Sequence, residues 1–264
     1  MRNIYILLIF TLFFSACAIK KNQKISNQQV LYSEKKQATQ EDFEDEFEDE
    51  FEENANDVND PFEPYNRIMT SFNDKVFVYF FNPISKVYAT VLPRVVRKGI
   101  SNIFKNLLYP ARLTNNILQG KVKNSFEETQ RFIINSTIGI FGIFDIAKEH
   151  FDINAHNEDF GQTLGYWGIA SGPHIVLPFF GPSNLRDIFQ LPVDNYIDPT
   201  NSVGSLPYKI PNNFVQGSVI FTLNYVNKNS LNLGLYDTLK KDSLDFYTFT
   251  RNFYEEKRKN DIKE

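Results

Sequence analysis

Beyond its first 17 residues the chain contains no run of about 18 apolar residues, the length that a helix needs to cross a bilayer. Yet aromatic side chains are abundant, with 26 Phe and 13 Tyr. So many aromatics indicate either a dense core or contact with lipid. Alternating strand patterns are scarce, so we predict a mainly α fold. A helical domain of this kind would contact a membrane by lying in its interface, with its backbone hydrogen bonds satisfied internally.

The N-terminus has the plan of a secretory signal. Residues 1–16 start with a positive charge, continue through an apolar stretch that ends at Phe14, and finish on small residues before Cys17. Small residues before a cysteine resemble the lipobox of bacterial lipoproteins, although Phe14 stands where Leu is commonest. The resemblance implies lipid attachment at Cys17 and, with Ala18 following, sorting to the outer membrane. An ordinary signal peptide and a buried cysteine are the alternatives, but this only cysteine has no disulfide partner.

Residues 17–59 are expected to form a lipidated flexible tether. Within it, residues 41–53 read EDFEDEFEDEFEE, and such a block of like charges repels itself and usually stays disordered. Its Phe residues recur every fourth position, so a transient helix would align them on one face. A solvated spacer and a docking motif for a periplasmic partner both fit this run.

The acidic tether accounts for the net charge of −4. From Pro61 onward, 22 Lys and Arg stand against 19 Asp and Glu. This slight basic excess is far from the bias of a nucleic-acid-binding protein, so we expect no nucleic-acid partner.

Residues 60–264 are expected to form one helical domain, with a C-terminal helical part over 210–264. The apolar spacing over 99–109 predicts an amphipathic helix that ends at Tyr109-Pro110. Ser125 and Glu128 have the spacing of a capping box, which predicts a second helix start.

Glycines and prolines interrupt the middle of this domain. The glycines between residues 161 and 172 predict a loop-rich stretch. Ile175–Phe180 is an apolar run of six residues bounded by Pro173 and Gly181, too short to cross a membrane. It predicts a hairpin strand, a re-entrant turn or a buried plug.

No motif in the chain carries recognisable enzyme chemistry. The three histidines lack metal-ligand spacing and are expected on the surface or in loops: His150, His156 and His174. Gly168–Gly172 has the wrong spacing for a nucleophile elbow, and Gly161–Gly165 lacks the Lys of a phosphate-binding loop. We therefore expect no catalytic residue, no metal and no cofactor.

Several blocks, in one order, resemble the MlaA (VacJ) family of lipoproteins. They run through Asp60–Arg67, Phe72–Asp74, Gly99–Phe104, Asn115–Lys121, Arg131–Gly139, Gly142–Asp145, Glu158–Gly168, Gly181–Ser183 and Leu185–Asp187. The resemblance covers about residues 60–200, is weaker after residue 210 and leaves out the acidic run.

The resemblance implies a flat, ring-like helical domain that lies in the outer membrane around a central amphipathic channel. Phospholipid misplaced in the outer leaflet would enter this channel and pass to a periplasmic lipid carrier, and a porin trimer would be a partner. This is retrograde phospholipid transport that maintains lipid asymmetry, without covalent chemistry. The alternative function is a structural lipoprotein that bridges envelope layers through its acidic tether; a phospholipase has little support.

The resemblance and the residue types together give two sets of candidate site residues. The channel or gate candidates are Asn66, Arg67, Phe72, Asn73 and Asp74, where Arg67 would steer phosphate or, alternatively, form an ion pair on the helix surface. The membrane-facing candidates, for which plain core packing is the alternative, are Val76, Phe77, Val78, Phe80, Phe81, Ile175, Val176, Leu177, Phe179 and Phe180.

Overall fold

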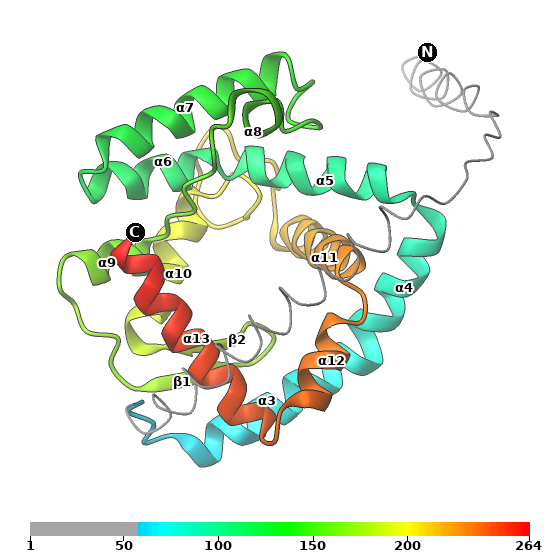
Figure 1. The fold of residues 1–264 in the computed structure, drawn as a ribbon, viewed down its shortest axis with the longest axis vertical. Coiled ribbons are helices and arrows are strands. Elements are labelled where there is room, and N and C mark those ends of the chain that lie inside the picture. Colours follow the sequence, from blue (N-terminus) through cyan, green and yellow to red (C-terminus); the bar gives the residue numbers. More distant parts are fainter. Residues whose placement is uncertain (1–57) are drawn as a thin grey trace, which may run out of the picture. The chain divides into compact units, whose positions relative to one another are not determined.

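The computed structural model describes residues 58–264, and helices dominate this part of the chain (Figure 1). Cys17 and residues 41–53 lie outside the described part. The elements are α3 (Glu63–Val76), η1 (Phe77–Phe81), α4 (Asn82–Val91), α5 (Arg94–Leu107), α6 (Tyr109–Leu118), α7 (Val122–Thr137), α8 (Ile146–Phe151), α9 (Phe160–Tyr166), β1 (His174–Leu177), β2 (Gly181–Asn184), α10 (Leu185–Ile197), α11 (Phe214–Leu231), α12 (Leu235–Asp242) and α13 (Phe246–Lys263). The prediction of a mainly α fold is confirmed.

Prolines mark several helix boundaries. Pro110 lies in the first turn of α6, where a missing backbone N–H costs nothing, and Pro93 precedes α5. Pro83 lies just after the π-helical segment η1, which continues into α4 without a break. The helix predicted over residues 99–109 is confirmed as α5, although it starts earlier, at Arg94, directly after Pro93.

Two local predictions were wrong. Helix α7 begins at Val122, so Ser125 lies inside it and its hydroxyl donates to the carbonyl of Lys121 at 2.9 Å instead of capping the helix. Gly161 lies in helix α9, not in a loop. A Cβ there would lie 2.2 Å from Oε1 of Gln190, so this glycine serves close packing between helices and not a turn.

The apolar run at Ile175–Phe180 forms a two-stranded antiparallel hairpin with the segment after it. In its register His174 faces Asn184 and Leu177 faces Gly181. This confirms the first of the three predicted possibilities. His174 was expected on the surface or in a loop, but it lies in β1 and is buried, and its Nδ1 is 2.9 Å from a carboxylate oxygen of Glu255.

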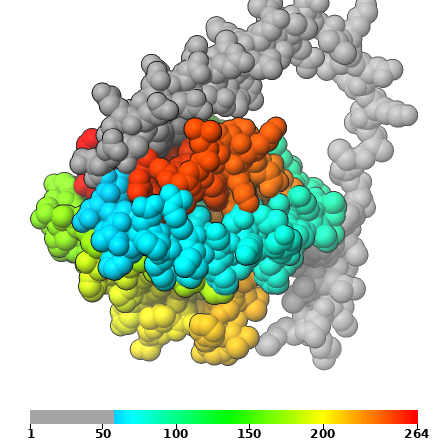
Figure 2. Space-filling model, turned by 90° about the horizontal axis from the view of Figure 1, so that it is seen from below, coloured from blue at the N-terminus to red at the C-terminus, as the bar shows by residue number. Residues whose placement is uncertain are grey.

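The helices are arranged around this hairpin and around α11. Helices α3, α4 and α5 follow one another around the rim of the view, from the bottom past the right to the top, and α6 and α7 pack together as a pair (Figure 1). Helix α11 contacts α4 and α5, while α3 and α13 both contact the hairpin. Figure 2 shows the segment near residue 200 on one side of α3 and the C-terminal helices on the other. Elements from both ends of the described chain therefore surround the hairpin.

Among the described residues, polar side chains are buried more often than apolar ones. Seven hydrophobic side chains are buried, against 27 polar or charged ones. Helix α7 shows the pattern clearly, because its buried residues recur every three or four positions and are all polar: Ser125, Glu128, Arg131 and Asn135. Phe126 and Ile133 of the same helix are exposed. The usual arrangement of a water-soluble helical domain is thus reversed.

Most of the buried charges are paired with one another, and Arg97 donates to backbone carbonyls instead. Arg258 lies 2.6 Å from Asp159 and 2.8 Å from Asp187, and Arg112 lies 2.7 Å from Glu128. Burial acts to raise the pKa of Asp187, but hydrogen bonds from Arg186 and Arg258 outweigh it and hold this pKa below its usual value. Such pairing is what permits charges in the interior of the domain.

None of the helices within residues 58–264 combines the length and the apolar character needed to cross a membrane.

Candidate functional site

Two asparagines of α3 hold strand β1 in place. The amide of Asn66 donates to the carbonyl of His174 at 3.0 Å and accepts the backbone N–H of Val176 at 2.8 Å. Asn73 repeats this pattern, donating to the carbonyl of Leu177 at 2.9 Å and accepting the N–H of Phe179 at 2.7 Å. Each side chain therefore pairs with the strand as a neighbouring backbone would.

The spacing of the two asparagines explains why both reach the strand. Asn66 and Asn73 are seven residues apart, which is about two helical turns and a rise of about 10.5 Å on the same face. Their partners on the strand are shifted by three residues, which is about 10 Å of extended chain. The spacing of the two asparagines therefore matches the spacing of their backbone partners. Their side chains make the hydrogen bonds to β1 and the turn after it that a third strand would make.

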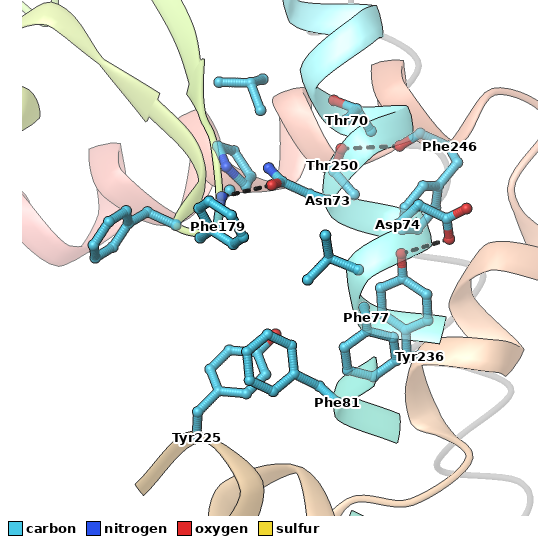
Figure 3. A pocket seen from close by; sticks show the side chains of 15 residues that line it. Thr70, Asn73, Asp74, Phe77, Phe81, Phe179, Tyr225, Tyr236, Phe246 and Thr250 are labelled. Atoms are coloured by element: carbon cyan, nitrogen blue, oxygen red, sulfur yellow. Dashed lines mark hydrogen bonds between the residues drawn. The ribbon is translucent and has the colours of Figure 1, made fainter. Parts of the chain in front are cut away.

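A cavity of about 220 Å³ lies between α3, the tip of the hairpin and the three C-terminal helices (Figure 3). Its wall combines aromatic rings with a few polar groups. In Figure 3 the rings of Phe81 and Tyr225 lie at one end, and Asn73 lies at the other. The full lining is Thr70, Asn73, Asp74, Val76, Phe77, Phe81, Val176, Phe179, Phe180, Gly181, Pro182, Tyr225, Tyr236, Phe246 and Thr250.

Asp74 is the acidic group in this lining, and it is fully engaged. Tyr236 donates its hydroxyl to Asp74 at 2.9 Å, and the ammonium of Lys240 lies 2.7 Å from both carboxylate oxygens. Burial first, and then the hydrogen bond to Asp74, raise the pKa of Tyr236, so this phenol stays a neutral donor. The cavity wall therefore carries little net charge.

A second, larger groove of about 610 Å³ adjoins this cavity. Its lining is mostly apolar: Phe72, Lys75, Val76, Tyr79, Phe80, Phe81 and Phe179. Val76, Phe81 and Phe179 line both spaces, so only a thin wall of side chains separates them. The wall includes η1, a π-helical segment, and π-helical turns occur often at functional sites.

Phe179 lies at the tip of the hairpin in a strained conformation. Its φ is +68°, in the left-handed region that bulky residues avoid. Its ring meets the ring of Phe72 edge to face, with centroids 5.2 Å apart. The hydrogen bond to Asn73 and this ring contact hold the tip against the strain.

The predicted channel or gate residues have different positions. Phe72, Asn73 and Asp74 line the two spaces described above. Asn66 is completely buried, and its amide forms hydrogen bonds with the hairpin. The prediction that Asn66 lines a channel was therefore wrong.

Arg67 is occupied by two carboxylates. It lies 2.7 Å from Glu63 and 2.7 Å from Asp245, and its guanidinium stacks 4.8 Å from the ring centre of Tyr247. Of the two roles expected for Arg67, the structure therefore shows the ion pair on the helix surface.

The predicted membrane-facing residues also divide into groups. Phe80, Phe179 and Phe180 are exposed, and Val76, Val78, Phe81, Ile175 and Leu177 are partly exposed. Phe77 and Val176 are only 8% and 2% exposed, so their prediction as membrane-facing was wrong. Phe77 packs instead on the ring of Tyr236, with centroids 4.0 Å apart.

Sequence reasoning missed the C-terminal half of the cavity wall. Tyr225, Tyr236, Phe246 and Thr250 come from three helices far along the chain, and no local pattern connects them with α3. Within the described residues no three His, Cys, Asp or Glu side chains come together as a metal site.

Known proteins resemble this chain in sequence and in fold. The model of the MlaA lipoprotein family matches residues 58–261. An intermembrane phospholipid transport system lipoprotein MlaA of Escherichia coli K12 is 36% identical over 131 residues, which is 48% of this chain and 52% of that protein. The lipoprotein of the same name from Haemophilus influenzae is 28% identical over 200 residues, 75% of this chain and 77% of that protein.

A solved structure extends the similarity to three dimensions. It comes from work on the structural basis for maintenance of bacterial outer membrane lipid asymmetry, and it matches with a TM-score of 0.65 at 26% identity. The match covers 77% of this chain and 98% of the other. Sequence and fold agree over the same region, and the chain belongs to the MlaA lipoprotein family.

Proposed function

We propose that this protein is an outer-membrane lipoprotein that removes misplaced phospholipid from the outer leaflet and passes it to a periplasmic carrier. In this role it maintains the lipid asymmetry of the membrane. Cys17 carries the lipid anchor, and a porin trimer holds the domain in the membrane. The relatives named for intermembrane phospholipid transport support this family role.

The observation that carries the proposal is the pair of adjoining spaces at the hairpin. The larger groove is almost entirely apolar and suits acyl chains, while the smaller cavity offers hydroxyl and amide groups beside aromatic rings. A phospholipid needs both environments, because a head group left in an apolar space would lose its hydration at high cost. Passage of lipid between the two spaces would displace the shared side chains of Val76, Phe81 and Phe179.

The reversed distribution of polar and apolar residues supports a location in lipid. Large hydrophobic side chains are exposed on α5, α7 and α11, and exposed apolar surface of this extent marks contact with a membrane or a protein. The hydroxyl and amide groups of the cavity would give the lipid path its polar lining. We propose that the helices surround this path as a ring that lies flat in the membrane.

The proposed role is binding and transfer, without covalent chemistry. The groups that line the cavity are aromatic rings, hydroxyls, an amide and a carboxylate that is already paired with Lys240. We assign no catalytic residue and no cofactor to this chain.

The proposal is tested by measuring outer-leaflet phospholipid in a deletion strain. We expect outer-leaflet phospholipid to rise in the deletion, and expression of the wild type to restore it. The Cys17→Ala protein should fail to restore it. Unchanged outer-leaflet phospholipid in the deletion would contradict the proposed transport role.

A second comparison tests the path itself. Val76→Trp fills the wall that the groove and the cavity share, so it should not restore asymmetry. Ile84→Trp on α4, at an exposed position outside both linings, is the matched control and should restore it. Equal restoration by both variants, at equal amounts in the outer membrane, would show that lipid does not pass this wall.

A further inference from the structure

A separate polar pocket of about 210 Å³ lies away from the hairpin. It is formed by α5, α6, α7, α8 and the segment that follows α8, and it shares no lining residue with the two spaces described above. Its lining is Asn102, Lys105, Asn106, Arg112, Arg131, Asn135, Asp145, Lys148, Asn154, Ala155 and Asn157.

Positive charge dominates this pocket. Four cationic side chains line it, and Asp145 is the acidic residue among its lining residues. Arg131 lies 2.9 Å from Asp145, and Arg112 lies 2.7 Å from Glu128 just behind the wall. Even with both carboxylates included, the cations outnumber the acids by two to one.

Two of the cations have no acidic partner within the described part of the chain. The ammonium groups of Lys105 and Lys148 form no ion pair there, and both side chains are exposed at the pocket. Their charge is therefore available to a ligand.

Arg131 adds a buried donor that the domain leaves unused. Its side chain is only 6% exposed, and its Nη atoms bind Asp145 and the carbonyl of Ile153. Its Nε has no hydrogen-bond partner among the described residues. A buried donor without a partner costs about 1–3 kcal/mol, so such atoms call for a functional explanation.

We propose that this pocket binds a phosphate group. Arginine and lysine donors are the usual partners of phosphate oxygens, and the surrounding asparagine amides add further donors. A volume of about 210 Å³ is below the range of about 300–1,000 Å³ that holds drug-sized ligands, so the pocket suits a free phosphate or a phosphodiester head group, with acyl chains left outside. The proposal is independent of lipid transport, because binding is measured directly.

The test is calorimetric titration of the purified full-length lipoprotein in detergent, in a phosphate-free buffer of fixed ionic strength. One arm uses inorganic phosphate, and the other uses glycerophosphoglycerol, a phospholipid head group without its acyl chains. The variant is Lys105→Gln with Lys148→Gln. The matched control is Lys86→Gln with Lys98→Gln, which removes the same charge from exposed positions on α4 and α5 outside the pocket.

We expect Kd for the better probe to rise at least about tenfold in the pocket variant and to stay unchanged in the control. Tighter binding of glycerophosphoglycerol identifies a lipid head group as the ligand, and tighter binding of inorganic phosphate identifies the free ion; both support a phosphate site. Absence of binding to the wild type, or equal weakening in both variants, would overturn the proposal. Circular dichroism of each variant verifies that it is folded.

Discussion

The side-chain oxygen of Asn73 accepts the backbone N–H of Phe179 at 2.7 Å, and through this bond α3 holds the tip of the hairpin. The same amide donates to the carbonyl of Leu177 at 2.9 Å. One side chain thus fixes both ends of the turn that separates the groove from the cavity.

Replacing Asn73 with alanine should release the tip. The backbone groups of Leu177 and Phe179 lose their partner; the bond to the carbonyl of Leu177 is partly buried, and its loss costs about 1–3 kcal/mol, whereas water can reach the exposed N–H of Phe179. We expect faster amide hydrogen exchange at Phe179 with little change in the helices. Asn260→Ala, at an exposed position on α13, is the control. Equal exchange at Phe179 in wild type and variant would show that Asn73 does not hold the turn.

The strain at Phe179 can be measured separately from the loss of its ring. Both Phe179→Gly and Phe179→Ala remove the ring, but only glycine adopts a positive φ without steric cost. We expect the glycine variant to have the higher free energy of unfolding, by about 1 kcal/mol. At the neighbouring Phe180, where φ is not positive, the order should reverse, with alanine more stable than glycine. Denaturant unfolding in detergent gives both differences, and the same order at both positions would rule out strain at the tip.

Asp194 should make stability depend on pH. Burial raises its pKa from 3.8 to about 6, against the opposing hydrogen bonds from the N–H of Phe160 and from Asn115. The folded state therefore holds this proton more tightly than the unfolded state. Its contribution to stability is complete below about pH 4 and is lost as the pH rises to about 6.

Asp194→Asn imitates the protonated form and should remove this dependence. We expect wild type and variant to have similar Tm values near pH 4 and the variant to have the higher Tm at pH 7. Thermal unfolding across this pH range measures the difference. A constant difference in Tm between the two proteins would mean that Asp194 does not titrate there.

Arg258 should be among the most sensitive positions in the domain. It is buried between Asp159 and Asp187, and removing its charge leaves Asp159 without its ion-pair partner and Asp187 with Arg186 alone. Breaking a buried pair in this way costs about 3–5 kcal/mol, so Arg258→Gln should lower the free energy of unfolding by about that amount. Its neighbour Lys257, in an exposed pair with Asp261, is the matched control, and Lys257→Gln should change stability by less than about 0.5 kcal/mol. Similar losses in both variants would contradict the role of Arg258 in the interior.

The exposed apolar face of α7 should bind lipid without the anchor. In a Cys17→Ala background, Phe126→Ser with Ile133→Ser removes two side chains that are 64% and 55% exposed. Each buried side chain of this size contributes about 1.5–3 kcal/mol, so binding to phospholipid vesicles should weaken strongly. Lys123→Gln on the same helix is the control. Unchanged vesicle flotation of the double variant would show that this face does not enter the membrane.

Some local features of the fold were predicted from the sequence better than the surroundings of individual side chains. Spacing and proline positions correctly predicted helix α5 and the break near Pro110, and a hairpin was one of the three structures expected at Ile175–Phe180. These features depend on the local backbone, so the sequence of a single segment is enough to predict them.

The placement of side chains was predicted less well. His174 looked like a loop residue because its partner Glu255 is 81 positions away. Ser125 and Glu128 have capping-box spacing, but the helix had already begun at Val122, and Glu128 binds Arg112 of α6. Phe77 and Val176 have the apolar character of the exposed residues beside them, and only the packing of Tyr236 and α3 decides that they are buried.

The polar interior has a consequence for how the protein tolerates change. Hydrophobic cores accept many substitutions of similar volume, because dispersion has no direction. Hydrogen-bonded pairs such as Arg112 with Glu128 require defined donors and acceptors at defined angles. A complete mutational scan should therefore give the inverse of the usual pattern, with interchangeable apolar residues on the outside and a nearly invariant network of asparagine, arginine and acid inside. Among natural relatives, the positions that vary would then mark the surface of the domain, and the positions that stay constant would mark its buried hydrogen-bond network.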